Sequence, residues 1–160
     1  ESEDSRGDLG AAHMEDWNKN VAIYLTDKQS AGYYEFIDTL SSVAIGDVTD
    51  KINITNVYPK LGQGDNVVLM INKLQKTWEA SGVSVAVYKS NSSGQFHYLI
   101  VTRYKEGLKE KTPGFRKPFK ETYEAVNGQG SYEQYQKDLA EYIEKSWSEL
   151  LFLKKDMSSK

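Results

Sequence analysis

The hydrophobic pattern of residues 52–104 changes from the period of a strand to that of a helix and back again. Apolar and polar residues alternate along 52–58, which is typical of a half-buried strand. A helical stripe of apolar residues follows at Val67, Ile71, Leu74 and Trp78. Asp65 is placed to cap the beginning of this helix, and Gly82 stands where the helix is expected to end. We therefore predict a strand followed by a helix whose stripe lies in the core.

Two more strands are predicted after this helix. Alternation returns at 83–89, a polar turn follows at 91–94, and the longest strand is expected at 96–104. We predict that these two strands pair with each other. One face of the longest strand carries Phe96, Tyr98 and Ile100, and the other carries His97, Leu99 and Val101. A strand that is apolar on both faces is expected to be covered on both.

The chain before residue 52 gives weaker signals. Residues 1–16 are acidic and lack an apolar period, so we expect a disordered tail or a cloning remnant, unless a signal peptide has been removed from this end. Residues 17–160 are expected to form a single domain. Within it, 20–26 fits both a strand and a helix, whereas 30–43 is predicted to be a helix.

The chain after residue 104 is predicted to contain two helices and a final strand. The first helix is expected over 119–126. Ser131 and Gln134 have the spacing of a capping box, which predicts the start of a longer helix. The apolar run 150–153 is typical of a buried strand.

The composition narrows the function classes. No apolar run approaches the roughly 20 residues of a spanning helix, so membrane insertion is not expected. The net charge of −3 is concentrated in 1–16, which leaves a nearly neutral body without the basic face of a nucleic-acid binder. With no cysteine and 2 histidines, neither a disulfide framework nor a structural metal site is expected. No phosphate loop or nucleophile motif is recognised, so no cofactor is expected.

His97 is the candidate for acid–base chemistry, because imidazole alone among side chains has an ordinary pKa close to neutrality. Tyr88, Tyr104 and Trp78 are the aromatic side chains expected to line a ligand pocket. The alternative is that His97 is an ordinary strand residue beside the hairpin. In that case the aromatic side chains fill the interface between sheet and helices.

The order strand, helix, strand, strand, helix, strand over about 52–155 predicts an α+β fold. It is the ferredoxin-like βαββαβ arrangement, a four-stranded antiparallel sheet with helices on one face, here with an N-terminal extension. The chain resembles the dimeric α/β-barrel superfamily, including its uncharacterised bacterial members. The residues that carry the resemblance are Tyr58-Pro59-Lys60-Leu61-Gly62-Gln63-Gly64 and Trp147-Ser148-Glu149-Leu150-Leu151.

This resemblance implies a homodimer in which two sheets pack face to face. Residues 17–50 are additional to the minimal fold, and the alternative is that they cover the open sheet face and leave a monomer. The superfamily includes cofactor-free oxygenases and cyclases, and its enzymes place a histidine or polar aromatic groups inside the barrel. A periplasmic or secreted location is the expectation for this chain.

Three functions follow as hypotheses. The first is a non-enzymatic ligand-binding or interaction protein that takes a small apolar or aromatic ligand. The second is a cofactor-independent oxygenase or cyclase-like enzyme in which His97 is the general base. The third is integrin binding through Arg6-Gly7-Asp8, a tripeptide that resembles integrin-recognition loops.

Overall fold

A computed structural model describes residues 10–24, 32–46, 49–92 and 94–154. The chain divides into two units, Glu1–Ala31 and Gly32–Lys160. The first unit contains helix α1 (Gly10–Asn20) and the short 3-10 helix η2 (Ala22–Tyr24). Helix α1 thus begins inside the stretch 1–16 that the sequence predicts to be disordered. The described part of 20–26 contains the end of α1 and η2, so it is helical and is not a strand.

The second unit is built on a five-stranded antiparallel sheet. Its strands are β1 (Tyr33–Phe36), β2 (Lys51–Pro59), β3 (Ser84–Ser92), β4 (Tyr98–Arg103) and β5 (Ile143–Phe152). Their order across the sheet is β1-β3-β4-β2-β5. The predicted pairing of 83–89 with 96–104 is confirmed, with Val87 opposite Ile100. The sheet has one strand more than the four predicted.

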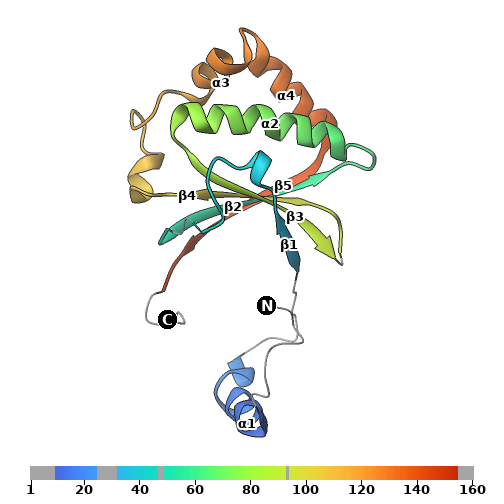
Figure 1. Cartoon of the computed structure of the whole chain (residues 1–160), viewed down its shortest axis with the longest axis vertical. Coiled ribbons are helices and arrows are strands. Elements are labelled where there is room, and N and C mark those ends of the chain that lie inside the picture. The colour runs from blue at the N-terminus through green and yellow to red at the C-terminus, as the bar shows by residue number, and fades with distance from the viewer. Residues whose placement is uncertain (1–9, 25–31, 47–48, 93, 155–160) are drawn as a thin grey trace. The chain divides into compact units, whose positions relative to one another are not determined.

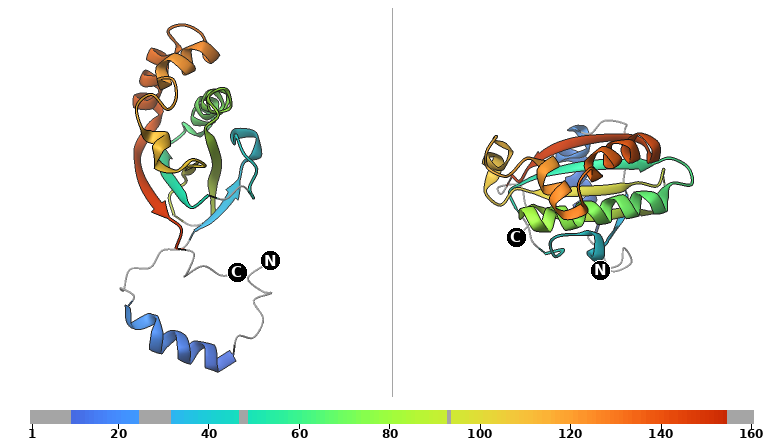
Figure 2. Two further views of the ribbon diagram at one scale, coloured as in Figure 1. Left: turned by 90° about the vertical axis from the view of Figure 1, so that its left-hand side faces the viewer. Right: turned by 90° about the horizontal axis from the view of Figure 1, so that it is seen from above.

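Three helices lie on one face of this sheet (Figure 1; Figure 2, right). They are α2 (Gly64–Ser81), α3 (Phe119–Asn127) and α4 (Ser131–Tyr142). The predicted stripe of α2 is buried, and its members Val67, Ile71, Leu74 and Trp78 belong to the hydrophobic core. Strand residues Val85, Val87 and Tyr98 meet this stripe from the sheet. The fold is therefore α+β, and its core lies between α2 and the sheet.

Aromatic side chains fill the space between α3 and α4. Tyr123 is 1% exposed, and its ring centroid lies 5.1 Å from that of Tyr135. Burial raises the pKa of Tyr135 to about 12, with a smaller contribution from the neighbouring Tyr123 and Tyr132. The raised pKa reflects a hydroxyl that is partly withdrawn from water where the Tyr135 ring packs against the core.

The helix predicted at 30–43 is wrong, because β1 and the 3-10 helix η3 (Asp38–Leu40) occupy the described part of this range. Strand β1 pairs with β3, with Phe36 opposite Tyr88. The backbone of β3 also bonds the segment after η3, since Val87 N donates to Ser41 Oγ at 2.8 Å. Pairing with a sheet edge therefore overrides the local helical period.

Neither of the two predicted N-terminal caps is found, because Gln63 and Gly130 are the N-cap residues of α2 and α4. Helix α2 begins at Gly64, so Asp65 lies within its first turn, where a negative charge still favours the positive helix end. A capping box needs its serine at the N-cap, but Ser131 is already the first residue of helix α4. The Ser131 hydroxyl is buried without a hydrogen-bond partner in the described structure. Gln134 instead donates to Asp138 Oδ1 at 2.8 Å.

The apolar run 150–153 falls at the end of strand β5, whose last residue is Phe152, but it is not buried. Leu151 is 42% exposed and Phe152 is 51% exposed. Strand β5 is at the edge of the sheet and has only β2 as a neighbour. The predicted burial is therefore wrong, because no described strand or helix covers this end of β5.

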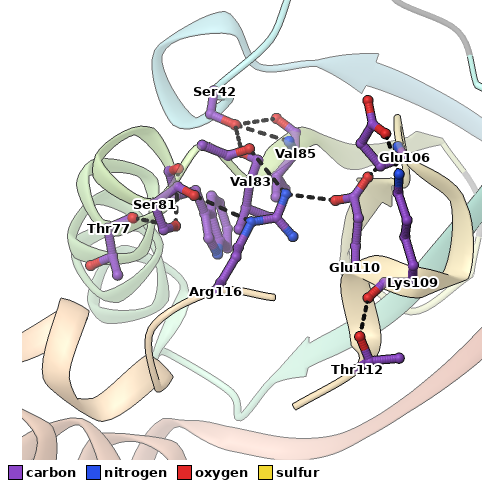
Figure 3. Close-up of polar contacts among 12 residues, drawn as sticks. Ser42, Thr77, Ser81, Val83, Val85, Glu106, Lys109, Glu110, Thr112 and Arg116 are labelled. Carbon is purple, nitrogen blue, oxygen red and sulfur yellow. Dashed lines mark hydrogen bonds and ion pairs between the residues drawn. The ribbon is translucent and has the colours of Figure 1, made fainter. Parts of the chain in front are cut away.

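A buried ion pair anchors the loop between β4 and α3, which contains the 3-10 helix η4 (Gly107–Lys111) (Figure 3). The Glu110 side chain is 2% exposed and accepts a hydrogen bond of 2.6 Å from Arg116 Nη2. Arg116 Nε also donates to the Ser81 carbonyl at 3.2 Å, and Nη2 donates to the Gly82 carbonyl at 3.3 Å. The Arg116 cation thus lies at the C-terminal end of α2, where the helix dipole favours positive charge.

Candidate functional site on the uncovered sheet face

The sheet face opposite α2 is rich in apolar and aromatic side chains. Val85, Val87 and Tyr98 point toward the helices, so the alternate residues of the same strands point to the other face. No described helix of this unit lies on that second face (Figure 1; Figure 2, left). The register brings together on it Phe36, Tyr88, Leu99, Val101, Ile52, Ile54, Trp147 and Leu151. We call this surface the open face.

A groove of about 500 Å³ lies on the open face. Its lining is mainly apolar and comes from strands β1 to β5 and the segment before β2. The lining residues are Tyr34, Thr49, Asp50, Ile52, Ile54, Tyr88, Leu99, Val101, Arg103, Leu151, Phe152 and Leu153. A groove of this size and character is typical of small-molecule sites, which combine an apolar lining with a few polar groups.

Arg103 is the buried cation of this groove, with only 6% of its surface exposed. Its Nη1 donates to the Ala44 carbonyl at 3.0 Å, and its Nη2 donates to the Ile45 carbonyl at 3.2 Å. Nη2 also donates to the Tyr88 hydroxyl at 3.4 Å. The segment after η3 therefore holds the guanidinium against the neighbouring strand, and the side chain of Tyr88 completes the polar end of the groove.

His97 is also on the open face, and its ring is held by three neighbours. Its Nδ1 lies 2.9 Å from the Gln95 carbonyl, so Nδ1 carries the proton and donates it. Its Nε2 lies 3.4 Å from the Tyr34 hydroxyl, which donates to it when the ring is neutral. The ring stacks on Tyr58 with centroids 4.6 Å apart and planes 17° apart. The Tyr34 hydroxyl thus lies at the nitrogen through which His97 would act on a substrate.

The structure brings only part of the predicted site together. Tyr88 and His97 share the open face, and Tyr34 connects them because it contacts His97 and also lines the groove. Trp78 packs in the core on the opposite side of the sheet, so it cannot line the same cavity. Tyr104 is 8% exposed beyond the end of β4, with Lys111 Nζ 5.8 Å from its ring centroid.

The groove residues Arg103 and Tyr34, which carry its polar contacts, were not among the predicted site residues. Alternation along the strand could have found Arg103, because it follows Leu99 and Val101 at the same two-residue spacing. Tyr34 had no such signal, because its segment has the local pattern of a helix. The tripeptide Arg6-Gly7-Asp8 lies outside the described residues.

Among the described residues, no three side chains of His, Asp or Glu come together as a metal site, and none of the helices has the length and apolar character needed to cross a membrane. No protein-family model matches the chain, and neither does any curated protein or solved structure.

Proposed function

We propose that the protein is a non-enzymatic binding protein that holds a small apolar ligand in the groove of its open face. The observation that carries this proposal is the groove itself, about 500 Å³ in volume and lined mainly by apolar side chains. Large apolar patches that a chain leaves uncovered mark ligand or partner sites more often than chance exposure does. The groove also has the few polar groups, Arg103 and Tyr88, that fix a ligand's orientation.

A ferredoxin-like core is part of this proposal. Strands β2 to β5 follow one another as β3-β4-β2-β5 across the sheet, with β1 added beside β3. Helix α2 connects β2 to β3, which are separated by β4, and α3 and α4 connect β4 to β5. This alternation of strands and helices supports a split βαβ arrangement that β1 extends by one edge strand.

We further propose that a second copy of the chain covers the open face. A ligand in an open groove keeps one side in water, whereas small-molecule sites bury most of the ligand surface. Two sheets packed face to face enclose the ligand and also cover Trp147, which is 46% exposed, and Leu151, which is 42% exposed. Residues 33–36 extend the sheet at its edge and do not cover this face themselves.

Light scattering on the purified chain tests the dimer. We expect a mass twice the 18.1 kDa of one chain, falling toward 18.1 kDa on dilution. Leu151→Asp places a charge on the open face and should shift the equilibrium toward the monomer, since burying an unpaired charge is costly. A mass of 18.1 kDa at the highest attainable concentration contradicts the dimer.

Calorimetry with 1-octanol, a neutral apolar probe, tests the ligand site. We expect saturable binding by the wild type and a loss of at least about tenfold in affinity for Leu151→Asp, because the charge removes apolar surface from the groove. Leu69→Asp is the matched control, since Leu69 lies on α2 and is 62% exposed. The proposal is wrong if the wild type does not bind octanol or if both variants bind it equally well.

A further inference from the structure

We infer that the preferred ligand of the groove is an amphipathic carboxylate, whose oxygens accept hydrogen bonds from the Tyr88 hydroxyl and the Arg103 guanidinium. This inference rests on the proposed function and names the chemical class of its ligand. The apolar body of the ligand would lie along Ile52, Ile54 and Val101, which line the same groove.

At the polar end of the groove, the Tyr88 hydroxyl and the Arg103 guanidinium have N–H and O–H groups that donate to no described acceptor. The Tyr88 hydroxyl accepts a hydrogen bond from Arg103 Nη2 at 3.4 Å, so its own proton is left to be donated. Within the described part of the chain, no acceptor takes that proton. Arg103 has five N–H groups, and its three described hydrogen bonds leave donors over. A ligand that complements this end must therefore bring acceptor oxygens.

The charge of this end favours an anion. Arg103 is 6% exposed, and no described carboxylate forms an ion pair with it. A buried cation held only by neutral oxygens is stabilised further when an anion binds beside it. Asp50 also lines the groove, but Lys51 Nζ lies 2.6 Å from its Oδ2 and offsets its charge. One buried cation within an apolar groove matches a ligand with one negative charge and an apolar body.

The donors are held in place before any ligand arrives. The carbonyls of Ala44 and Ile45 hold the guanidinium in one orientation, and the Phe36 ring packs on Tyr88 with centroids 5.5 Å apart. Donors fixed in this way lose little side-chain freedom when they bind a ligand. Because a hydrogen bond from a cation to a carboxylate is stronger than one to a neutral oxygen, the N–H groups that Arg103 has left favour a carboxylate over a neutral hydroxyl.

Three eight-carbon probes with different head groups separate the inference from the proposed function. Calorimetry near pH 7.5 compares octanoate, 1-octanol and octylamine on the wild type. We expect octanoate to bind about tenfold more tightly than octanol, because hydrogen bonds to charged groups are the stronger ones, and octylamine to bind most weakly. Tyr88→Phe removes one donor and keeps the ring, so it should weaken octanoate binding by about fivefold and leave octanol binding unchanged.

Two further variants test whether the effect is specific to the groove and to the guanidinium. Tyr104→Phe makes the same change at a tyrosine that does not line the groove, and it should leave octanoate binding unchanged. Arg103→Lys keeps the charge but loses the planar guanidinium that the Ala44 and Ile45 carbonyls hold in place, and it should reduce the preference for octanoate over octanol. Equal affinities for octanoate and octanol, or octanoate binding that survives Tyr88→Phe unchanged, would overturn the inference while the proposed function stands. If none of the three probes binds, the proposed function fails as well.

Discussion

Replacing Trp78 with alanine is expected to lower the free energy of unfolding by about 3–5 kcal/mol. Trp78 lies in the last turns of α2 and is only 9% exposed, with Leu74 one turn before it in the same core. Removing the indole deletes its contacts with the sheet and leaves a cavity that close-packed neighbours can fill only in part. Urea denaturation of the purified variant measures the loss.

Trp17→Ala is the matched control, because Trp17 lies on α1 and is 42% exposed. Its substitution should change the free energy of unfolding by less than about 1 kcal/mol, as for most exposed positions. If Trp78→Ala also costs less than about 1 kcal/mol, Trp78 is not a core residue and the packing of α2 described above is wrong.

The second large effect is expected at the ion pair between Glu110 and Arg116. Arg116→Ala should lower the free energy of unfolding by about 3 kcal/mol, because it leaves the Glu110 carboxylate buried without its cation. The Glu110 side chain is 2% exposed, whereas that of Arg116 is 24% exposed, so most of the cost falls on the carboxylate. The same variant also removes the hydrogen bonds to the carbonyls of Ser81 and Gly82 at the end of α2.

A double-mutant cycle with Glu110→Gln separates these contributions. The double variant should be more stable than Arg116→Ala alone, because the unpaired charge has been removed with its partner. Lys109→Ala is the control at an exposed ion pair, since both Lys109 and Glu106 are 59% exposed, and it should have little effect. If Lys109→Ala lowers the free energy of unfolding as much as Arg116→Ala does, the burial of Glu110 is not the cause of the large effect.

Residues 52–82 were predictable because the spacing of their apolar residues along the sequence matches the positions that are buried in the fold. Strand β2 and helix α2 match the predicted 52–58 strand and the stripe that ends at Gly82. Gly82 has the left-handed backbone conformation, with φ of 67°, that such a helix end favours. The alternation of 96–104 also placed His97 and Tyr98 on opposite faces, as the structure has them.

The remaining features depend on contacts between distant segments, which a local pattern does not contain. The apolar residues of 33–43 have helical spacing, but residues 33–36 form backbone hydrogen bonds with β3 instead of a helix. Leu40 packs in the core. An apolar run such as 150–153 indicates a strand without indicating whether anything covers it. The polar end of the groove likewise combines Arg103 with the carbonyls of Ala44 and Ile45, which lie 59 and 58 residues away in sequence.

Chemical-shift mapping of the backbone amides during titration with octanoate tests the central claim most directly, because it reports which face of the sheet meets the ligand. We expect saturable shifts for Ile52, Ile54 and Val101 on the open face, and no comparable shifts around Leu69 on the outer surface of α2. Shifts confined to the helices, or no saturable shifts on β2 and β4, would contradict the claim that the open face is the binding surface.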